Sequence, residues 1–259
     1  MPNTISLVGL SDIGRARSRN EDSLALSPSS GIAVVADGMG GHPNGDVASR
    51  IAATQTTRML EERLGSSSSP DEEPRSHMRA AMMASVVAAH RAIRTACAED
   101  ELLEGMGTTL TSMALDRDRK RYTLGHVGDS RAYLFRAGVL SQLTTDDTWV
   151  QARVDASELT PEQARHHPYS HVLTQCVGLE DEPAPHILDG VAAVDDVYLL
   201  CSDGLVGMLE DADIVSVMRE RLGDAPSAAN LEDTAQALVA AANEAGGNDN
   251  ITVVLVLVG

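Results

Sequence analysis

The chain has 259 residues and carries 20 Lys and Arg against 38 Asp and Glu, which gives a formal net charge of −18. This acidic balance argues against a nucleic-acid partner, because binding the phosphate backbone requires a surface rich in Lys and Arg. Hydrophobic residues make up 43% and charged residues 22% of the chain, which excludes a disordered protein and predicts a sizeable core.

Short runs rich in β-branched and apolar residues predict strands along the whole chain, and most are bounded by Gly, Asp or Asn. They cover residues 4–10, 31–37, 109–115, 121–127, 131–135, 197–202 and 251–258. Ala137-Gly138 is typical of a hairpin turn after the fifth run, and a charged turn separates the third from the fourth. The strands therefore come in antiparallel runs.

Helical spacing of apolar residues predicts helices between these strands. The first ends at Gly65, and a polar link over residues 66–74 leads to a second, which Ser76 is expected to cap. Two later helices are expected, one closed by Gly223 and one between Ser227 and Gly246. The stripes that define the four helices are Val47, Ile51, Leu60, Leu64; Met78, Met82, Val86, Ala89, Ile93, Cys97; Ile214, Met218, Leu222; and Leu231, Ala235, Leu238, Ala242. This order favours helices stacked on antiparallel sheets in one domain of residues 1–259.

The cysteines, the N-terminal residues and the length of the apolar runs predict a cytoplasmic protein without a membrane partner. Cys97, Cys176 and Cys201 are far apart and form no CxxC pair, so neither a disulfide framework nor a zinc site is indicated. The N-terminus lacks the basic and apolar stretches of a signal peptide. The longest apolar run, residues 251–258 and broken only by Thr252, is far shorter than the roughly 18–20 residues that span a bilayer.

Acidic residues follow directly on several apolar strands. Because strands present their ends, these acids are expected to converge at one rim of the sheets and to repel one another unless cations neutralise them. An Asp-Gly after a strand is a common turn signal, and any one of these acids alone is more typical of a turn than of a metal ligand. Together the oxygen ligands favour Mg²⁺ or Mn²⁺ over zinc or copper. The acids are Asp37, Asp129, Asp203 and Asp249, with the acidic pair Glu21 and Asp22.

A basic segment precedes the acidic pair, with Arg15, Arg17 and Arg19 in a chain that is otherwise poor in positive charge. It is either a solvated patch or the source of a bidentate clamp for a phosphate. Metal ions that activate water beside such an arginine would form a phosphoester hydrolase site. In DGMGGH (residues 37–42), glycine would let the Gly38 carbonyl approach a metal.

Six ordered motifs resemble those of the metal-dependent PPM, or type 2C, Ser/Thr protein phosphatases, in the form found in bacteria. They are GRARSRNED, DGMGG, GTT (107–109), GHVGDSR, SDG (202–204) and GNDNIT (247–252), and they span nearly the whole chain. The resemblance implies an α+β fold: a central antiparallel β-sandwich flanked by helices on both faces, with a two-metal centre at one end.

The resemblance also implies a set of metal ligands. Asp37 would bridge two Mn²⁺ or Mg²⁺ ions, and the Gly38 carbonyl would bind the second. Asp203 and Asp249 would complete the protein ligands of the first, while Glu21 would act through water.

Further roles follow from the same resemblance. Asp129, with Asp203, would hold a third, weaker metal, and Arg17 would bind the substrate phosphate. Arg15 and Arg19 would be surface residues, and Asn250 would support the loop that aims Asp249.

Two departures from the family pattern concern catalysis. Eukaryotic relatives carry a histidine, proposed to protonate the leaving alkoxide, where this chain has Met39. His42 would substitute only if its loop folded back, so water on the third metal is the favoured proton donor. Asp147 stands where relatives often have histidine, which leaves the role of that position open.

A segment at about residues 144–175 resembles the family's flap over the active site. Thr160-Pro161 is typical of a helix start. Trp149, the only tryptophan, is a candidate contact for a substrate protein. The flap histidines are predicted to be exposed residues and not a metal site, since no fourth ligand has suitable spacing; they are His166, His167 and His171.

The expected activity is hydrolysis of phosphoserine and phosphothreonine by a metal-activated water, on protein substrates of a Ser/Thr kinase. No CxxxxxR or DxDx[TV] motif indicates a covalent phospho-enzyme. The alternative is a phosphatase-like regulatory module that binds partners with little or no turnover. We expect a monomer.

Overall fold

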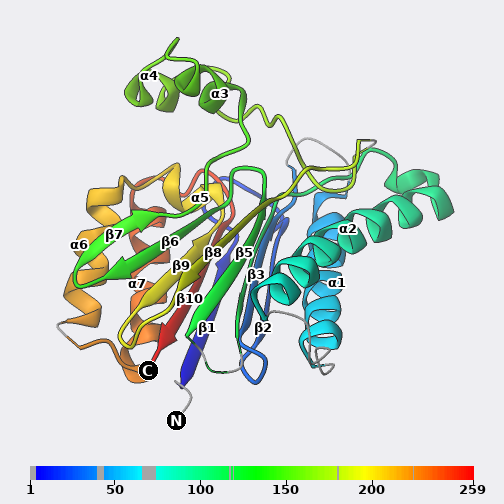
Figure 1. Ribbon diagram of the computed structural model, residues 1–259. Coiled ribbons are helices and arrows are strands. Elements are labelled where there is room, and N and C mark those ends of the chain that lie inside the picture. The colour runs from blue at the N-terminus through cyan, green and yellow to red at the C-terminus, as the bar shows by residue number, and fades with distance from the viewer. Residues whose placement is uncertain are drawn as a thin grey trace.

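The computed structural model describes residues 4–39, 44–65, 74–116, 118, 120–179, 181–223 and 225–259. These residues form two antiparallel five-stranded sheets that face each other (Figure 1). The first sheet has the order β1 (Ile5–Asp12), β10 (Ile251–Val258), β9 (Val197–Cys201), β6 (Arg131–Arg136) and β7 (Val139–Gln142). The second has the order β2 (Asp22–Ser27), β3 (Ile32–Asp37), β4 (Leu110–Leu115), β5 (Arg121–Val127) and β8 (His186–Val191).

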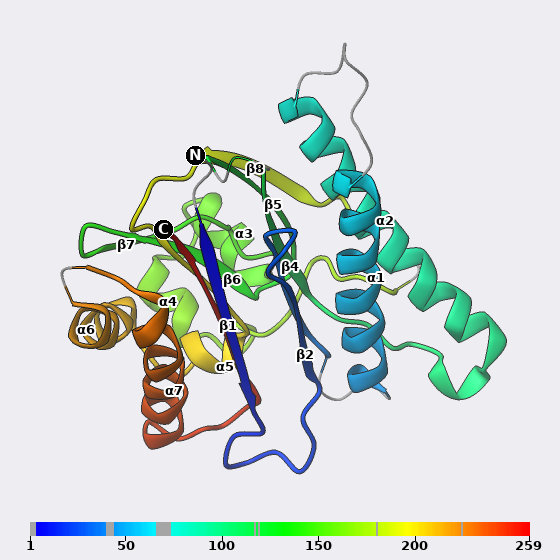
Figure 2. The same ribbon diagram turned by 90° about the horizontal axis from the view of Figure 1, so that it is seen from below.

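Helix pairs cover the outer face of each sheet, as the view from below shows (Figure 2). The helices α1 (Gly45–Gly65) and α2 (Pro74–Glu99) pack on the second sheet, and a short 3₁₀ turn, η1 (Glu101–Leu103), follows α2. The helices α6 (Asp211–Leu222) and α7 (Ala228–Glu244) pack on the first sheet. The predicted α+β sandwich with helices on both faces is confirmed.

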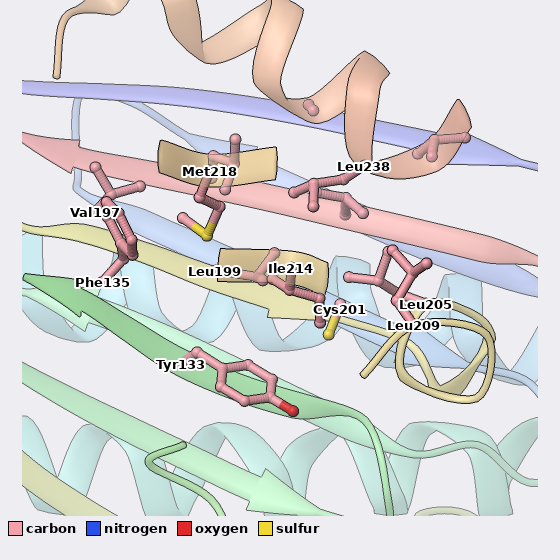
Figure 3. Packing of buried hydrophobic residues seen from close by; sticks show 14 of the residues in the cluster. Tyr133, Phe135, Val197, Leu199, Cys201, Leu205, Leu209, Ile214, Met218 and Leu238 are labelled. Carbon is pink, nitrogen blue, oxygen red and sulfur yellow. The ribbon is translucent and has the colours of Figure 1, made fainter. Parts of the chain in front are cut away.

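Strand alternation explains how one sequence builds three apolar layers, because successive side chains of a strand point to opposite faces. In β10, Val253 and Leu255 pack under α6 and α7, whereas Val254 and Val256 pack between the sheets. All eight residues of β10 are therefore buried. Figure 3 shows the layer under α6 and α7, where Met218 and Leu238 meet side chains of β6 and β9.

The predicted helices and strands are present, with one error at a helix start. Gly65 is the last residue of α1, and Gly223 follows α6 with a φ of 65°, in the left-handed region that favours glycine. Ser76 was expected to cap the second helix. That is wrong, because α2 begins at Pro74, whose fixed φ suits a first helical turn. The polar link lies mostly outside the described residues, as do His42 and Gly40.

Five elements were not predicted: the strands β2 and β8, the 3₁₀ turn η1, the helix α3 (Trp149–Asp155) and the short helix α5 (Asp203–Val206). The helix α3, with α4 (Pro161–Arg165), belongs to the flap segment and stands apart from the sandwich (Figure 1). Thr160 caps α4 through a capping box with Gln163, at the helix start that the sequence predicts. Among the described residues, no helix is long and hydrophobic enough to cross a membrane.

Candidate active site

Six of the seven predicted site residues line one cavity of about 1240 Å³ at the end of the sandwich. The lining also includes Met39 and His171. Glu21 is not part of this lining, and its main chain instead joins neighbouring segments: its N–H donates to Asn250 Oδ1 (2.8 Å), and its carbonyl accepts from Gly38 N–H (3.1 Å). The six residues are Arg17, Asp37, Gly38, Asp129, Asp203 and Asp249.

The strand pattern places Asp37 at the floor of this cavity. Ala33 and Val35 of β3 face the layer between the sheets, so Asp37, two residues further, continues on that face at the strand end. The GTT motif fixes its main chain. The Asp37 carbonyl accepts from Thr108 Oγ1 (2.8 Å) and Thr109 N–H (2.8 Å), and its N–H donates to Thr109 Oγ1 (3.0 Å).

Two glycines allow the close backbone approaches that shape the site. A Cβ at Gly38 would overlap the Gly45 carbonyl and come within 2.7 Å of the Glu21 carbonyl oxygen. A Cβ at Gly204 would overlap the Asn250 carbonyl. Side chains at either position would therefore separate the segments that carry Asp37, Asp203 and the acidic loop after α7.

Asp22 lies beneath Asp37 and was not among the predicted site residues. The two aspartates face each other across the β2–β3 ladder. Asp22 Oδ2 accepts hydrogen bonds from Ser202 Oγ (2.7 Å), directly after β9, and from Thr252 Oγ1 (2.6 Å), in β10 of the other sheet. Its Oδ1 is buried and has no protein partner. The signal in the sequence was the acidic pair at positions 21 and 22, of which only Glu21 had been assigned a role.

Burial makes this carboxylate cluster electrostatically unfavourable. It raises the pKa of Asp37 well above its ordinary value, and the charge of Asp22 adds to the effect. Burial likewise raises the pKa of Asp129, with a contribution from Asp203, and that of Asp203, with a contribution from Asp249. The pKa of Asp22 rises to about 7, again chiefly through burial. The site therefore contains more buried carboxyl groups than cationic side chains that could neutralise them.

Arg17 supplies a cation at one side of the cavity. Its Nη2 donates to Asp249 Oδ2 at 2.6 Å, and this hydrogen bond raises the pKa of the guanidinium. Asp249 Oδ1 accepts from Asn250 N–H (2.8 Å). Asn250 Nδ2 in turn donates to the carbonyls of Ile13 and Arg19, both at 2.9 Å. Asn250 thus joins the Asp249 loop to the arginine segment, the supporting contact expected of it.

The other basic residues of that segment turn away from the cavity. Arg15 donates to the Asn243 carbonyl (2.7 Å), and Arg19 pairs with Asp46 (3.1 Å). Neither guanidinium lines the cavity, so Arg17 is the member of the three that the fold directs to the carboxylates.

The oxygen atoms that line the cavity are of the chemical type that binds a hard divalent cation. Carboxylate and carbonyl oxygens are the ligands that Mg²⁺ and Mn²⁺ prefer, and the unpartnered Asp22 Oδ1 is a buried acceptor. No three acidic, His or Cys side chains of the described residues are already grouped closely enough to hold an ion. Arg17 and Asn250 engage both oxygens of Asp249.

Flap histidines do not gather into a metal site. His166 approaches Glu162 at 3.3 Å, His167 stacks on Trp149 with ring centroids 5.1 Å apart, and His171 lines the cavity. The guanidinium of Arg153 lies 4.8 Å above the same indole. Side chains of the flap therefore contact Trp149, and its role as a substrate contact stays a prediction.

The raised carboxyl pKa values predict a pH-dependent stability for protein kept in a chelator. Asp22 ionises at about 7 in the folded state, against about 3.9 in an unfolded chain. Between these values the folded state binds more protons, so the free energy of unfolding falls as pH rises, and this loss is complete above the folded pKa.

Urea unfolding in EDTA at about pH 5 and about pH 8 measures this difference. The wild-type protein is expected to lose more stability at the higher pH than Asp22→Asn, which has no charge to bury. An equal pH dependence in both proteins would contradict the prediction.

In this β-sandwich, buried carboxylates and one arginine lie together at the strand ends. This combination is typical of metal-dependent hydrolases. Residues 11–243 match the family described as Protein phosphatase 2C. The chain therefore belongs to the protein phosphatase 2C family, and the resemblance seen in its motifs is confirmed.

Curated relatives are bacterial proteins. The chain is 38% identical over 246 residues to the serine/threonine protein phosphatase PstP of Mycobacterium tuberculosis, covering 95% of this chain and 43% of PstP. It therefore spans less than half the length of that relative. It is 34% identical over 251 residues to the protein phosphatase PhpP of Streptococcus pneumoniae, covering 95% of each.

Solved structures share the whole fold. The catalytic domain of PstP in complex with two manganese ions superposes with a TM-score of 0.80 at 35% identity, covering 99% of both chains. The S. agalactiae serine/threonine phosphatase gives a TM-score of 0.81 at 33% identity, covering 98% of this chain and 100% of the other. The two manganese ions of the PstP catalytic domain agree with metal dependence in this family.

Proposed function

We propose that this protein hydrolyses phosphoserine and phosphothreonine on proteins with the help of two Mn²⁺ or Mg²⁺ ions. The observation that carries the proposal is that Asp37, Asp203 and Asp249, from distant parts of the chain, line one cavity beside Arg17. The names of the bacterial relatives PstP and PhpP support the same activity.

Five residues are proposed to hold the two cations. The carboxylates of Asp37, Asp203 and Asp249 and the Gly38 carbonyl would hold them, and Glu21 would contribute through water. The support is the position of Asp37, Gly38, Asp203 and Asp249 on one cavity wall and the burial of charge that their cations would neutralise. Asp129, with Asp203, is proposed to hold a third and weaker ion.

The chain's own residues would bind and orient the phosphate. When bound, the cations would supply an activated water for attack on phosphorus. Arg17 would leave Asp249 and hold two phosphoryl oxygens through its planar guanidinium, which favours the in-line arrangement and stabilises the charge of the transition state. Met39 has no proton to donate next to Gly38, so the leaving alkoxide would take its proton from solvent in the cavity.

Phosphorylated proteins made by a Ser/Thr kinase are the proposed substrates, and the proposed site of action is the cytoplasm. Cys97, Cys176 and Cys201 are free thiols, which agrees with a reducing compartment. The proposed form is a monomer, since one chain supplies all residues of the site.

Phosphate release from peptides tests the function. Phosphoserine and phosphothreonine peptides are expected to be hydrolysed with Mn²⁺ and not with EDTA, and much faster than a phosphotyrosine peptide. Peptide binding without phosphate release, at any Mn²⁺ or Mg²⁺ concentration, would overturn the proposal and favour the regulatory module.

A further inference from the structure

Asp147 is a buried acid for which neither the proposed ligand set nor the phosphate clamp provides a role. It lies at the start of the flap segment and is 8% exposed. Its Oδ1 accepts from His186 Nε2 (2.9 Å) and Gln175 Nε2 (3.1 Å), and its Oδ2 accepts from Gly128 N–H (3.0 Å). One carboxylate thus joins the β8 edge of a sheet, the far end of the flap and the loop between β5 and β6.

The contact with Gly128 reaches the proposed metal site, because Asp129 is the next residue. Asp147 N–H also donates to the Gly128 carbonyl (2.7 Å), so Asp147 holds both sides of this glycine. On the other side of Asp129, Arg131 donates to both oxygens of Asp146 (2.9 and 2.7 Å). The two consecutive aspartates therefore hold the turn that carries Asp129 from both ends.

The same residue joins the two ends of the flap. Thr174 N–H donates to the Asp147 carbonyl (2.8 Å). The next residues continue this pairing: Thr148 forms a bridge with Leu173, and Trp149 N–H donates to the Val172 carbonyl (2.8 Å). The flap helices α3 and α4 project from this paired base.

We propose that Asp147 is a positioning residue that sets the place of Asp129 and, through the same carboxylate, the base of the flap. This inference rests on the proposed function for the assignment of Asp129 as a ligand. The two hydrogen bonds between Asp147 and Gly128 directly connect the flap with the residue that precedes Asp129.

The number of donors explains why this position needs a carboxylate. Three N–H groups, from Gly128, Gln175 and His186, point at its two oxygens. An asparagine has one acceptor oxygen and places an NH₂ against at least one of these donors. Gly128 has a φ of 107°, so its peptide is held in a conformation that other residues rarely adopt.

The test compares Asp147→Asn with Asp155→Asn, a matched change at an exposed flap residue that contacts Gln151. Calorimetric titration with Mn²⁺ measures metal affinity without any substrate, and the component lost in Asp129→Ala identifies the site of interest. Acrylamide quenching of the single tryptophan, Trp149, reports on the flap. Circular dichroism checks that each variant is folded.

In Asp147→Asn the Asp129-dependent affinity for Mn²⁺ is expected to fall by about tenfold or more, and Trp149 is expected to become more accessible to acrylamide. Asp155→Asn is expected to match the wild type in both. If Asp147→Asn does not fold, His186→Ala, which changes a half-exposed side chain, is expected to increase the quenching of Trp149 as well.

Unchanged Mn²⁺ affinity and unchanged quenching in folded Asp147→Asn, or unchanged quenching in His186→Ala where the first variant is unfolded, would overturn the positioning role. A wild-type protein that binds Mn²⁺ but hydrolyses no phosphopeptide would count against the proposed function alone. The titration and the quenching would then still decide the role of Asp147.

Discussion

Asp37→Asn is expected to lower Mn²⁺-dependent phosphate release from a phosphothreonine peptide by on the order of 10³-fold. The substitution keeps the size of the side chain but removes the charge at the centre of the proposed ligand set. The Asp37 main chain is fixed by Thr108 and Thr109, so the variant is expected to keep its fold. Initial rates at saturating Mn²⁺ measure the effect.

Stability gives an independent check on this variant. Burial raises the pKa of Asp37, and Asp22 lies opposite, so in EDTA the charge of Asp37 destabilises the folded state at neutral pH. Asp37→Asn is therefore expected to unfold at a higher temperature than the wild type in EDTA and to gain less from added Mn²⁺. Asp233→Asn, on the surface between α6 and α7, is the control. Near wild-type activity in folded Asp37→Asn would contradict the two-metal assignment.

Arg17→Ala is expected to lower kcat/KM for the same peptide by on the order of 10²-fold, because one preorganised donor to the transferring phosphoryl group is lost. Arg17→Lys is expected to recover only part of this, since an ammonium lacks the planar pair of donors. Kinetics at several peptide concentrations separate the effects on kcat and KM.

Arg15→Ala is the matched control for Arg17. Both arginines belong to the same segment, but Arg15 donates to the Asn243 carbonyl outside the cavity. Affinity for Mn²⁺ is expected not to fall in Arg17→Ala, because Arg17 occupies an oxygen of Asp249. Equal activities for the Arg17 and Arg15 variants would argue against a phosphate-binding role for Arg17.

The strands that could be predicted from the sequence are the buried ones, because they consist mainly of apolar residues. The run 251–258 is apolar except for Thr252, because both of its faces are buried. By contrast, β8 contains Asp189-Gly190, which is typical of a turn, and it lies at a sheet edge. Gly190 is tolerated there because it lies against the Tyr122 ring, where a side chain would not fit. Such a pairing depends on a distant residue and leaves no local signal.

The same holds for the site: features that depend on neighbouring residues could be predicted, and contacts between residues far apart in the sequence could not. Acids at strand ends could be identified from their neighbours in the sequence, and Arg17 from the resemblance of its segment to the family motif. The contacts that hold Asp22 could not, because they come from Ser202, directly after β9, and from Thr252, in β10 of the other sheet. The role of Asp147 likewise depends on Gly128 and His186, which only the fold brings near.

The carboxylates come from both halves of the sandwich. Asp37 ends a strand of one sheet, while Asp203 and Asp249 adjoin strands of the other. A cation bound by all three would link the two sheets, which otherwise meet mainly through apolar side chains and have no disulfide among the described residues. Removing the cation would then remove both this link between the sheets and the proposed catalytic site.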